Sequence, residues 1–247
     1  MTSDLIIFGA IGFVAQLVDG ALGMAFGVLA SSSLLAFGAP PAIVSAAVHA
    51  AEIATTGVSG LSHVWQRNVN WRLLLRLAVA GMLGGAFGAY LLAEVLPERF
   101  VRPLVAAYLF AMAVLIFARV LGRAPAPPKV PAAPLGLAGG CLDAIGGGGW
   151  GPLVASTLIA TGDEPRRSIG TVNTAEFFVS FAVSIAFLAT LDLAGYGAVV
   201  LGLVAGGILA APLAGWLVRV MLPRLAMALV ATIVLGLSLY NFVRLVI

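Results

Sequence analysis

Charged side chains are scarce in this sequence of 247 residues: Asp, Glu, Lys and Arg together make up 9% of it, whereas apolar residues make up 62%. Soluble domains carry about 25% charged residues, so this composition excludes an ordinary soluble fold and indicates a polytopic membrane protein. Cysteine occurs once, as Cys141, which excludes an intrachain disulfide and a cysteine-based metal cluster. No basic stripe and no nucleotide-binding motif is present, so we expect no nucleic acid, no metal and no cofactor.

Long apolar runs account for most of the chain. Since a helix needs about 20 apolar residues to cross a bilayer, we expect six spans, at residues 43–64, 72–93, 101–120, 168–190, 196–218 and 224–246. Two further apolar segments, residues 5–37 and 133–161, are interrupted by glycine. Backbone polar groups in lipid must be paired within the protein, and no barrel-like alternation is visible. The predicted fold class is therefore an all-α polytopic membrane protein with about eight hydrophobic segments.

Both interrupted segments contain an aspartate followed by glycines. In the second segment, Asp143 precedes four consecutive glycines, residues 146–149. A helix continuing through them would lose roughly 1 kcal/mol per glycine relative to alanine. We therefore expect the helix to stop near Asp143 and to restart near Pro152, because proline is well tolerated in the first turn of a helix. In the first segment, Asp19 precedes a more widely spaced set of glycines, Gly20, Gly23 and Gly27.

The two interrupted segments belong to an internal duplication. Sliding the sequence against itself by 124 positions aligns them without gaps, and this single register pairs Asp19 with Asp143 and Glu52 with Glu176. Residues 122–132 between the halves are rich in proline and are expected to be an extended linker. The predicted organisation is a first membrane repeat at residues 1–121, the linker, and a second repeat at residues 133–247. Each repeat contains one interrupted segment and three spans.

Charge distribution distinguishes two topologies for the interrupted segments. If each segment crosses the membrane once, the Arg and Lys residues of the loops divide seven against six, which gives no orientation. If each is re-entrant, they divide ten against three, which is the asymmetry that cytoplasmic loops show. An odd number of full spans per repeat also makes the two repeats inverted. We therefore predict re-entrant segments, inverted repeats and both termini outside the cytoplasm.

Four acidic residues fall well inside apolar segments, where each costs about 2.5–3.5 kcal/mol on insertion scales. They are Asp19, Glu52, Asp143 and Glu176, and none has a Lys or Arg partner nearby in sequence. One interpretation is a protonatable relay that couples transport to protons. The alternative is that each carboxyl group simply stays protonated or, for the aspartates, caps the restarting helix.

The restarted half-helices suggest an anion site. Their N-termini would carry free N–H groups and the positive ends of helix dipoles to the middle of the membrane, and glycine lets a ligand approach the backbone closely. His49 also stands where Asn173 stands in the second repeat, one turn before the repeated glutamate. The candidate substrate-binding residues are Gly20, Gly23, Gly27, His49, Gly147, Gly148, Gly151 and Asn173.

The paired motifs, residues 19–27 (DGALGMAFG) and residues 143–152 (DAIGGGGWGP), each followed by a polar helix, resemble those of the sulfite exporter TauE/SafE family. The resemblance covers essentially the whole chain, including the duplication and the Pro-rich linker. It implies a permease of the bacterial inner membrane that moves small anions such as sulfite, sulfoacetate or other organosulfonates. The expected partners are the lipid bilayer, a small anionic substrate and a coupling proton, and no feature of the sequence sets the oligomeric state.

Two other functions fit parts of the sequence. The text Gly57-Val-Ser59-Gly60 is compatible with an intramembrane serine hydrolase if His49 or His63 lies within hydrogen-bond reach of Ser59. A non-transporting membrane assembly factor is the other alternative, and it predicts that replacing the buried acids leaves function intact. The duplicated acids favour a secondary transporter, which is not an enzyme.

Overall fold

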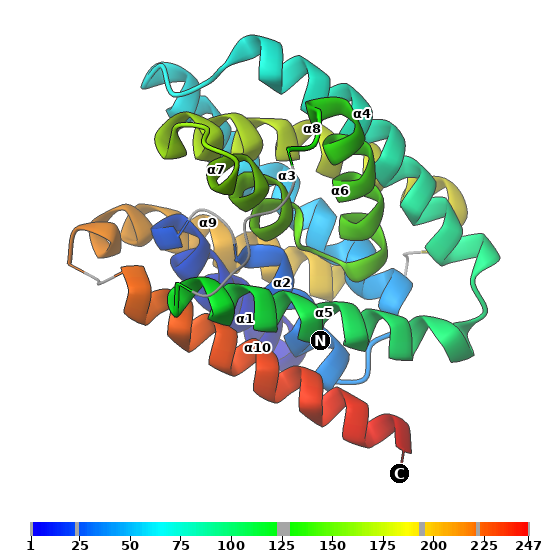
Figure 1. The fold of residues 1–247 in the computed structure, drawn as a ribbon. Coiled ribbons are helices and arrows are strands. Elements are labelled where there is room, and N and C mark those ends of the chain that lie inside the picture. The colour runs from blue at the N-terminus through cyan, green and yellow to red at the C-terminus, as the bar shows by residue number, and fades with distance from the viewer. Residues whose placement is uncertain (1, 23–24, 123–128, 193–195, 221–222, 247) are drawn as a thin grey trace.

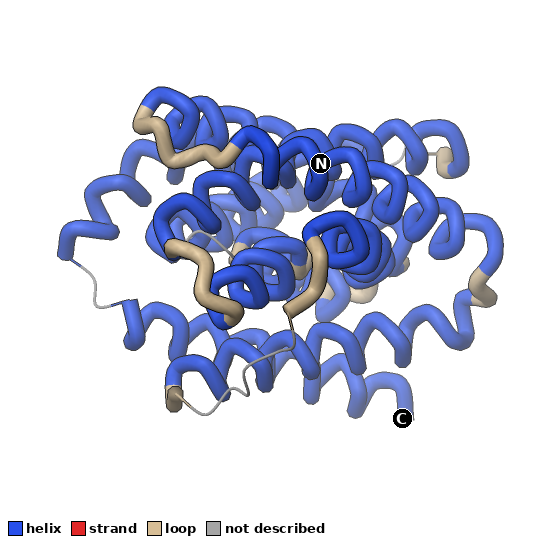
Figure 2. The backbone as a smooth tube through the Cα atoms, turned by 45° about the horizontal axis from the view of Figure 1, so that its top comes forward, coloured by secondary structure: helices blue, strands red, loops and turns tan. Residues whose placement is uncertain are grey.

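The computed structural model describes residues 2–22, 25–122, 129–192, 196–220 and 223–246, and the regular elements among them are all helices (Figures 1 and 2). The α-helices are α1 (Thr2–Leu22), α2 (Phe26–Ala36), α3 (Pro41–Trp65), α4 (Trp71–Tyr90), α5 (Glu98–Val120), α6 (Ala132–Gly146), α7 (Ser156–Ala160), α8 (Pro165–Thr190), α9 (Gly197–Val220) and α10 (Pro223–Val246). Two π-helical turns, η1 (Leu91–Val95) and η2 (Gly151–Ala155), follow α4 and precede α7. The predicted all-helical fold is confirmed.

The long helices coincide with the predicted spans. Within the residues that the structure describes, four of them are long and apolar enough to cross a membrane: Pro41–Trp65, Trp71–Val95, Arg99–Val120 and Pro165–Thr190. Helices α9 and α10 cover the remaining two predicted spans, and their apolar parts among the described side chains are Gly197–Ala210 and Met227–Val243. The predicted linker lies largely in residues 123–128, outside the described chain.

Both interrupted segments break where the aspartates and glycines predict, within a few residues. The first break separates α1, which ends at Leu22, from α2, which begins at Phe26. At the second break, α6 ends at Gly146, and Gly147, Gly148 and Gly149 have φ of 72°, 144° and 131°. Positive φ is costly for residues with a Cβ, so this chain path requires glycine. The segment then restarts through the π turn η2 and not as a regular α-helix from Pro152.

Helices α3 and α8, which the internal alignment makes equivalent, pack against each other in opposite directions. Gly60, near the end of α3, lies against Thr174, near the start of α8: a Cβ on the glycine would be 3.3 Å from the threonine Cα. Earlier on α3, Glu52 is bonded to Ser180, later on α8. Because residue numbers rise on one helix as they fall on the other, the two helices are antiparallel, as inverted repeats require.

Helix α1 packs along α9, in the other half of the chain. A Cβ on Gly202 would lie 2.7 Å from the Cβ of Phe8, and one on Gly206 would lie 2.7 Å from the backbone nitrogen of Phe13. Residue numbers rise together on the two helices, so α1 and α9 are parallel. The small residues let the two backbones approach closely.

The second half makes the reciprocal contact, because α6 packs along α4. A Cβ on Gly136 of α6 would lie 3.2 Å from the Cα of Leu77. In the first half, a Cβ on Gly12 would lie 2.7 Å from the Cα of Leu203 of α9. Positions 12 and 136 are equivalent in the 124-residue shift. Each interrupted segment is therefore supported by a helix of the other half.

These directions make each interrupted segment a hairpin. Helix α1 begins beside the first residues of α9. These lie on the same side of the bundle as the last residues of α8. Since α3 is antiparallel to α8, α3 begins at that same end, directly after α2. Hence the start of α1 and the end of α2 lie on the same side of the bundle. The same argument places the start of α6 and the end of α7 together on the opposite side. We call residues 2–36 the first hairpin and residues 132–160 the second. Helices α5 and α10 pack side by side along one face of the bundle (Figure 1).

Candidate functional site

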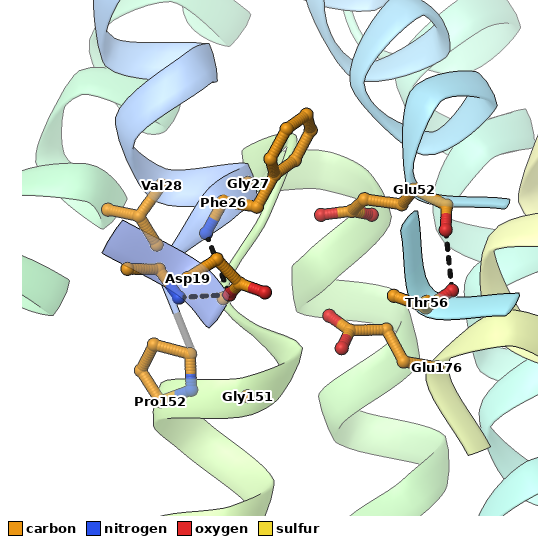
Figure 3. Close-up of a pocket in the computed structure, with 11 residues that line it drawn as sticks. Asp19, Phe26, Gly27, Val28, Glu52, Thr56, Gly151, Pro152 and Glu176 are labelled. Atoms are coloured by element: carbon orange, nitrogen blue, oxygen red, sulfur yellow. Dashed lines mark hydrogen bonds between the residues drawn. The ribbon is translucent and has the colours of Figure 1, made fainter. Parts of the chain in front are cut away.

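A small cavity lies between the breaks of the two hairpins and the middles of α3 and α8. Its free volume is about 10 Å³, which is about the least that can hold one water molecule. Figure 3 shows the carboxyl groups of Asp19, Glu52 and Glu176 directed toward this space from α1, α3 and α8. The remaining lining residues are Ala25, Phe26, Gly27, Val28, Thr56, Gly149, Gly151 and Pro152.

Asp19 and Asp143 both hold the start of the half-helix that follows them. Asp19 Oδ1 accepts hydrogen bonds from the backbone N–H groups of Ala25 (2.6 Å) and Phe26 (3.1 Å). Asp143 Oδ1 accepts one from the N–H of Trp150 (2.9 Å), and Trp150 is equivalent to Phe26 in the 124-residue shift. The capping alternative is therefore realised in both hairpins, and these N–H groups already have an acceptor.

His49 and Asp143 form a fully buried pair that joins the halves. His49 Nε2 lies 3.1 Å from Asp143 Oδ2, and both side chains have 0% exposure. His49 Nδ1 lies 2.8 Å from the carbonyl oxygen of Ser45, which only accepts, so Nδ1 carries a hydrogen. A single proton then lies between Nε2 and Oδ2. Either the imidazole is cationic beside a carboxylate or both groups are neutral, and the pair has no net charge in either case.

The tips of the hairpins, by which we mean the residues around the two helix breaks, touch through backbone atoms. A Cβ on Gly27 would lie 2.7 Å from the Cα of Gly148 and 2.7 Å from Glu52 Oε1, so only glycine fits at this approach. The Ser31 hydroxyl donates to the carbonyl of Gly147. The second hairpin is also held from α3, where the Ser45 hydroxyl donates to the carbonyl of Ala144 at 2.6 Å.

Glu52 and Glu176 differ in their contacts although they are equivalent in sequence. Glu52 is 2% exposed, and its Oε2 accepts a hydrogen bond of 3.2 Å from the Ser180 hydroxyl. Glu176 is half-buried, and among the described residues no hydrogen bond reaches its carboxyl group. Both side chains face the cavity (Figure 3).

The structure brings some of the predicted site residues to the cavity and places others nearby. Those that line it are Asp19, Gly27, Glu52, Gly151 and Glu176. Gly147 and Gly148 take part in the contact between the hairpins, and His49 and Asp143 form their own pair. Asn173 is 3% exposed, and its Oδ1 has no hydrogen-bond partner in the described part of the chain. Gly20 lies in the last turn of α1, and Gly23 lies outside the described residues.

Sequence reasoning missed three polar contacts at the site. Thr56 and Ser180 each follow a repeated glutamate by four residues, which places them on the same helix face, and this spacing could have identified them. The third contact is made by Arg119, whose Nη1 donates to the carbonyl of Pro152 at 2.9 Å. No signal in the sequence links Arg119 to the second hairpin.

The geometry that a serine hydrolase needs is not found in the described residues. No hydrogen bond joins Ser59 to either histidine there. His63 Nδ1 lies 3.5 Å from Asn68 Nδ2, and His49 is held by Asp143 and Ser45.

Comparison with known proteins agrees with the resemblance seen in the motifs. The sequence matches the family described as "Sulfite exporter TauE/SafE" over residues 8–241. It is also 41% identical over 236 residues to the "Probable membrane transporter protein YtnM" of Bacillus subtilis (strain 168), and the match covers 92% of this chain and 78% of that protein. No solved structure matches the chain. The chain therefore belongs to the sulfite exporter TauE/SafE family.

Proposed function

We propose that the protein is a secondary transporter of a small anion, such as sulfite or an organosulfonate, and that it couples transport to protons. One observation carries the proposal: three carboxyl groups converge on a cavity between two hairpin tips inside an apolar bundle. Ionisable groups at membrane depth are costly and typically mark ion or substrate pathways. The family and the similarity to a probable membrane transporter support the same function.

The carboxyl groups support the coupling of anion transport to protons. At an effective dielectric constant of about 20, two unit charges about 5 Å apart repel each other by roughly 3 kcal/mol. An anion that entered among three ionised carboxylates would meet that repulsion several times. It can enter at low cost only if Asp19, Glu52 and Glu176 are largely protonated, which supports the proposal that protons bind with the substrate.

The size of the cavity requires movement. Sulfite contains a sulfur and three oxygen atoms and does not fit into a space of about 10 Å³. We infer that the hairpin tips separate to admit substrate, first on one side of the membrane and then on the other. Hairpins from inverted repeats that meet near the middle of the bilayer suit such alternating access.

The purified protein in proteoliposomes tests the proposal. Labelled sulfite and a set of organosulfonates and carboxylates are offered with and without a proton gradient, and a pH-sensitive dye reports proton movement. We expect substrate-dependent flux that the gradient accelerates and that moves protons with the anion. Unchanged transport in the double variant Glu52→Gln, Glu176→Gln would eliminate the proton relay. No flux of any anion would favour an assembly factor.

We also propose that the protein resides in the bacterial inner membrane with both termini outside the cytoplasm. The antiparallel packing of α3 and α8 supports inverted repeats, which place both termini on the same side of the membrane. The ten-against-three distribution of loop cations supports the outer side. Cysteines introduced at positions 2 and 247, in a Cys141→Ala background, test it with a membrane-impermeant maleimide. Labelling of both positions from the cytoplasmic side alone would overturn the orientation.

A further inference from the structure

The hydroxyl groups of Thr56 and Ser180 occupy equivalent places in the two halves but make different hydrogen bonds. Thr56 follows Glu52 by four residues, and Ser180 follows Glu176 by four residues. The Ser180 hydroxyl crosses from α8 to α3 and donates to Glu52 Oε2 at 3.2 Å. The equivalent bond would run from the Thr56 hydroxyl to the carboxyl group of Glu176.

That second bond is not made in the described structure. The Thr56 hydroxyl donates instead to the backbone carbonyl of Glu52 at 2.5 Å, on its own helix (Figure 3). Thr56 and Glu176 nevertheless line the same cavity, so the two groups face a common space. Of two equivalent hydrogen bonds between α3 and α8 in the described part of the chain, the one from Ser180 to Glu52 is formed and the one from Thr56 to Glu176 is not.

Thr56 has room to change its contact. Besides the carboxyl-lined cavity, it borders an apolar pocket of about 350 Å³ between α3 and α8, whose other walls include Gly57, Thr174 and Phe177. A threonine side chain in a helix has two accessible χ1 rotamers, because one of them lets Oγ1 bond a carbonyl of the preceding turn. A change of rotamer would release the Glu52 carbonyl and free Oγ1 for a different acceptor.

We propose that Ser180 and Thr56 are positioning residues that alternate: the Glu52–Ser180 bond stabilises the state described here, and a Glu176–Thr56 bond stabilises the state that opens to the other side of the membrane. The inference rests on the proposed alternating-access function. Inverted repeats exchange their conformations when access switches sides. The hydrogen bond that Ser180 donates in one state is therefore expected to be replaced by the equivalent bond from Thr56 in the other state. Each hydroxyl then biases the equilibrium toward one of the two states.

Two variants with opposite effects test the inference. Ser180→Ala removes the bond of the state described here, and Thr56→Val removes that of the opposite state while preserving side-chain shape. Hydrogen bonds between membrane helices shift such equilibria by roughly threefold on average and at most about eighteenfold. In proteoliposomes without a proton gradient, we expect the ratio of KM for uptake to KM for efflux to change by about that factor, in opposite directions for the two variants.

Matched controls separate this role from a general effect on packing. Thr55→Val removes a buried hydroxyl that also faces the Glu52 carbonyl, at 3.4 Å, but the position equivalent to Thr55 is Val179. This variant should leave the KM ratio unchanged. Ser180→Thr and Thr56→Ser keep the hydroxyl donors and should retain the wild-type KM ratio. A shift in the same direction for Ser180→Ala and Thr56→Val, or no shift for Thr56→Val, would overturn the inference.

A measurement without substrate keeps the inference independent of the transported anion. Spin labels at Gln66→Cys and Asp163→Cys, in a Cys141→Ala background, report the distance between the end of α3 and the loop after the second hairpin. Both positions are exposed. We expect two distance populations whose ratio moves in opposite directions in Ser180→Ala and Thr56→Val. Reciprocal shifts without anion flux would refute the proposed function alone. Flux without reciprocal shifts would refute the alternation alone.

Discussion

The buried pair of His49 and Asp143 gives the sharpest prediction of stability. His49→Ala removes one partner and leaves Asp143 Oδ2 without its contact at a site with no exposure. Breaking a buried pair from one side typically costs about 3–5 kcal/mol. For a protein of this size, 1 kcal/mol corresponds to roughly 2–4 °C. We therefore expect the unfolding temperature in detergent to fall by about 10 °C.

The structure predicts a different result for Asp143→Asn. The asparagine Oδ1 can still accept from the Trp150 N–H, and its Nδ2 can donate to His49 Nε2, because the hydrogen on Nδ1 leaves Nε2 free to accept. The variant keeps both contacts and removes only the shared proton. We expect it to lose about 1 kcal/mol or less of folding stability, whereas Asp143→Ala, which also loses the helix cap, should cost at least as much as His49→Ala.

Differential scanning fluorimetry of the purified variants distinguishes these outcomes. His63→Ala is a suitable control, since the hydrogen-bond contact described for the His63 side chain is a long one, 3.5 Å to Asn68, and its loss should change the unfolding temperature little. If Asp143→Asn proved as unstable as Asp143→Ala, the assignment of one shared proton to His49 and Asp143 would be wrong. If His49→Ala left the unfolding temperature unchanged, the pair would not hold the halves together.

Three further predictions concern the hairpin tips and the cavity. Gly148→Ala should prevent the tips from meeting, because φ is 144° and the new Cβ would lie 2.7 Å from the backbone nitrogen of Val28. A fluorimetric assay should show an unfolding temperature several degrees lower. Gly197→Ala, whose new Cβ would have no atom within 4 Å, should match wild type. Glu52→Gln combined with Glu176→Gln should abolish the acceleration of uptake by a proton gradient, measured in proteoliposomes, while the protein remains folded. Arg119→Leu should cost about 1 kcal/mol of stability through the lost bond to the Pro152 carbonyl, and wild-type stability would show that this bond does not support the π turn.

Much of the fold could be predicted because lipid restricts the choices. Apolar runs located the spans, since only helices satisfy their own backbone in a membrane. Asp143 and the glycines after it located the break, because helix propensity fails over consecutive glycines. The difference in loop charge between two topologies then favoured hairpins, and the antiparallel contact of Gly60 with Thr174 agrees with that choice.

The contacts between the halves could not be predicted, because spacing along one helix does not specify its neighbour. The alignment of His49 with Asn173 suggested a pair of substrate ligands, whereas His49 engages the aspartate of the other half. Asp143 carries the same capping bond as Asp19, yet Asp19 lines the cavity and Asp143 does not. This difference follows from tertiary packing, which the repeat pattern does not encode.

The reciprocal packing of α1 on α9 and of α6 on α4 has a consequence for biosynthesis. The first hairpin enters the membrane long before the ribosome has made α9, so its glycine-rich face stays without its final partner while most of the chain is inserted. Neither half can bury its own hairpin, which makes each half an incomplete folding unit. Genetically separated halves should therefore be degraded when expressed alone and should accumulate only when both are made in the same cell.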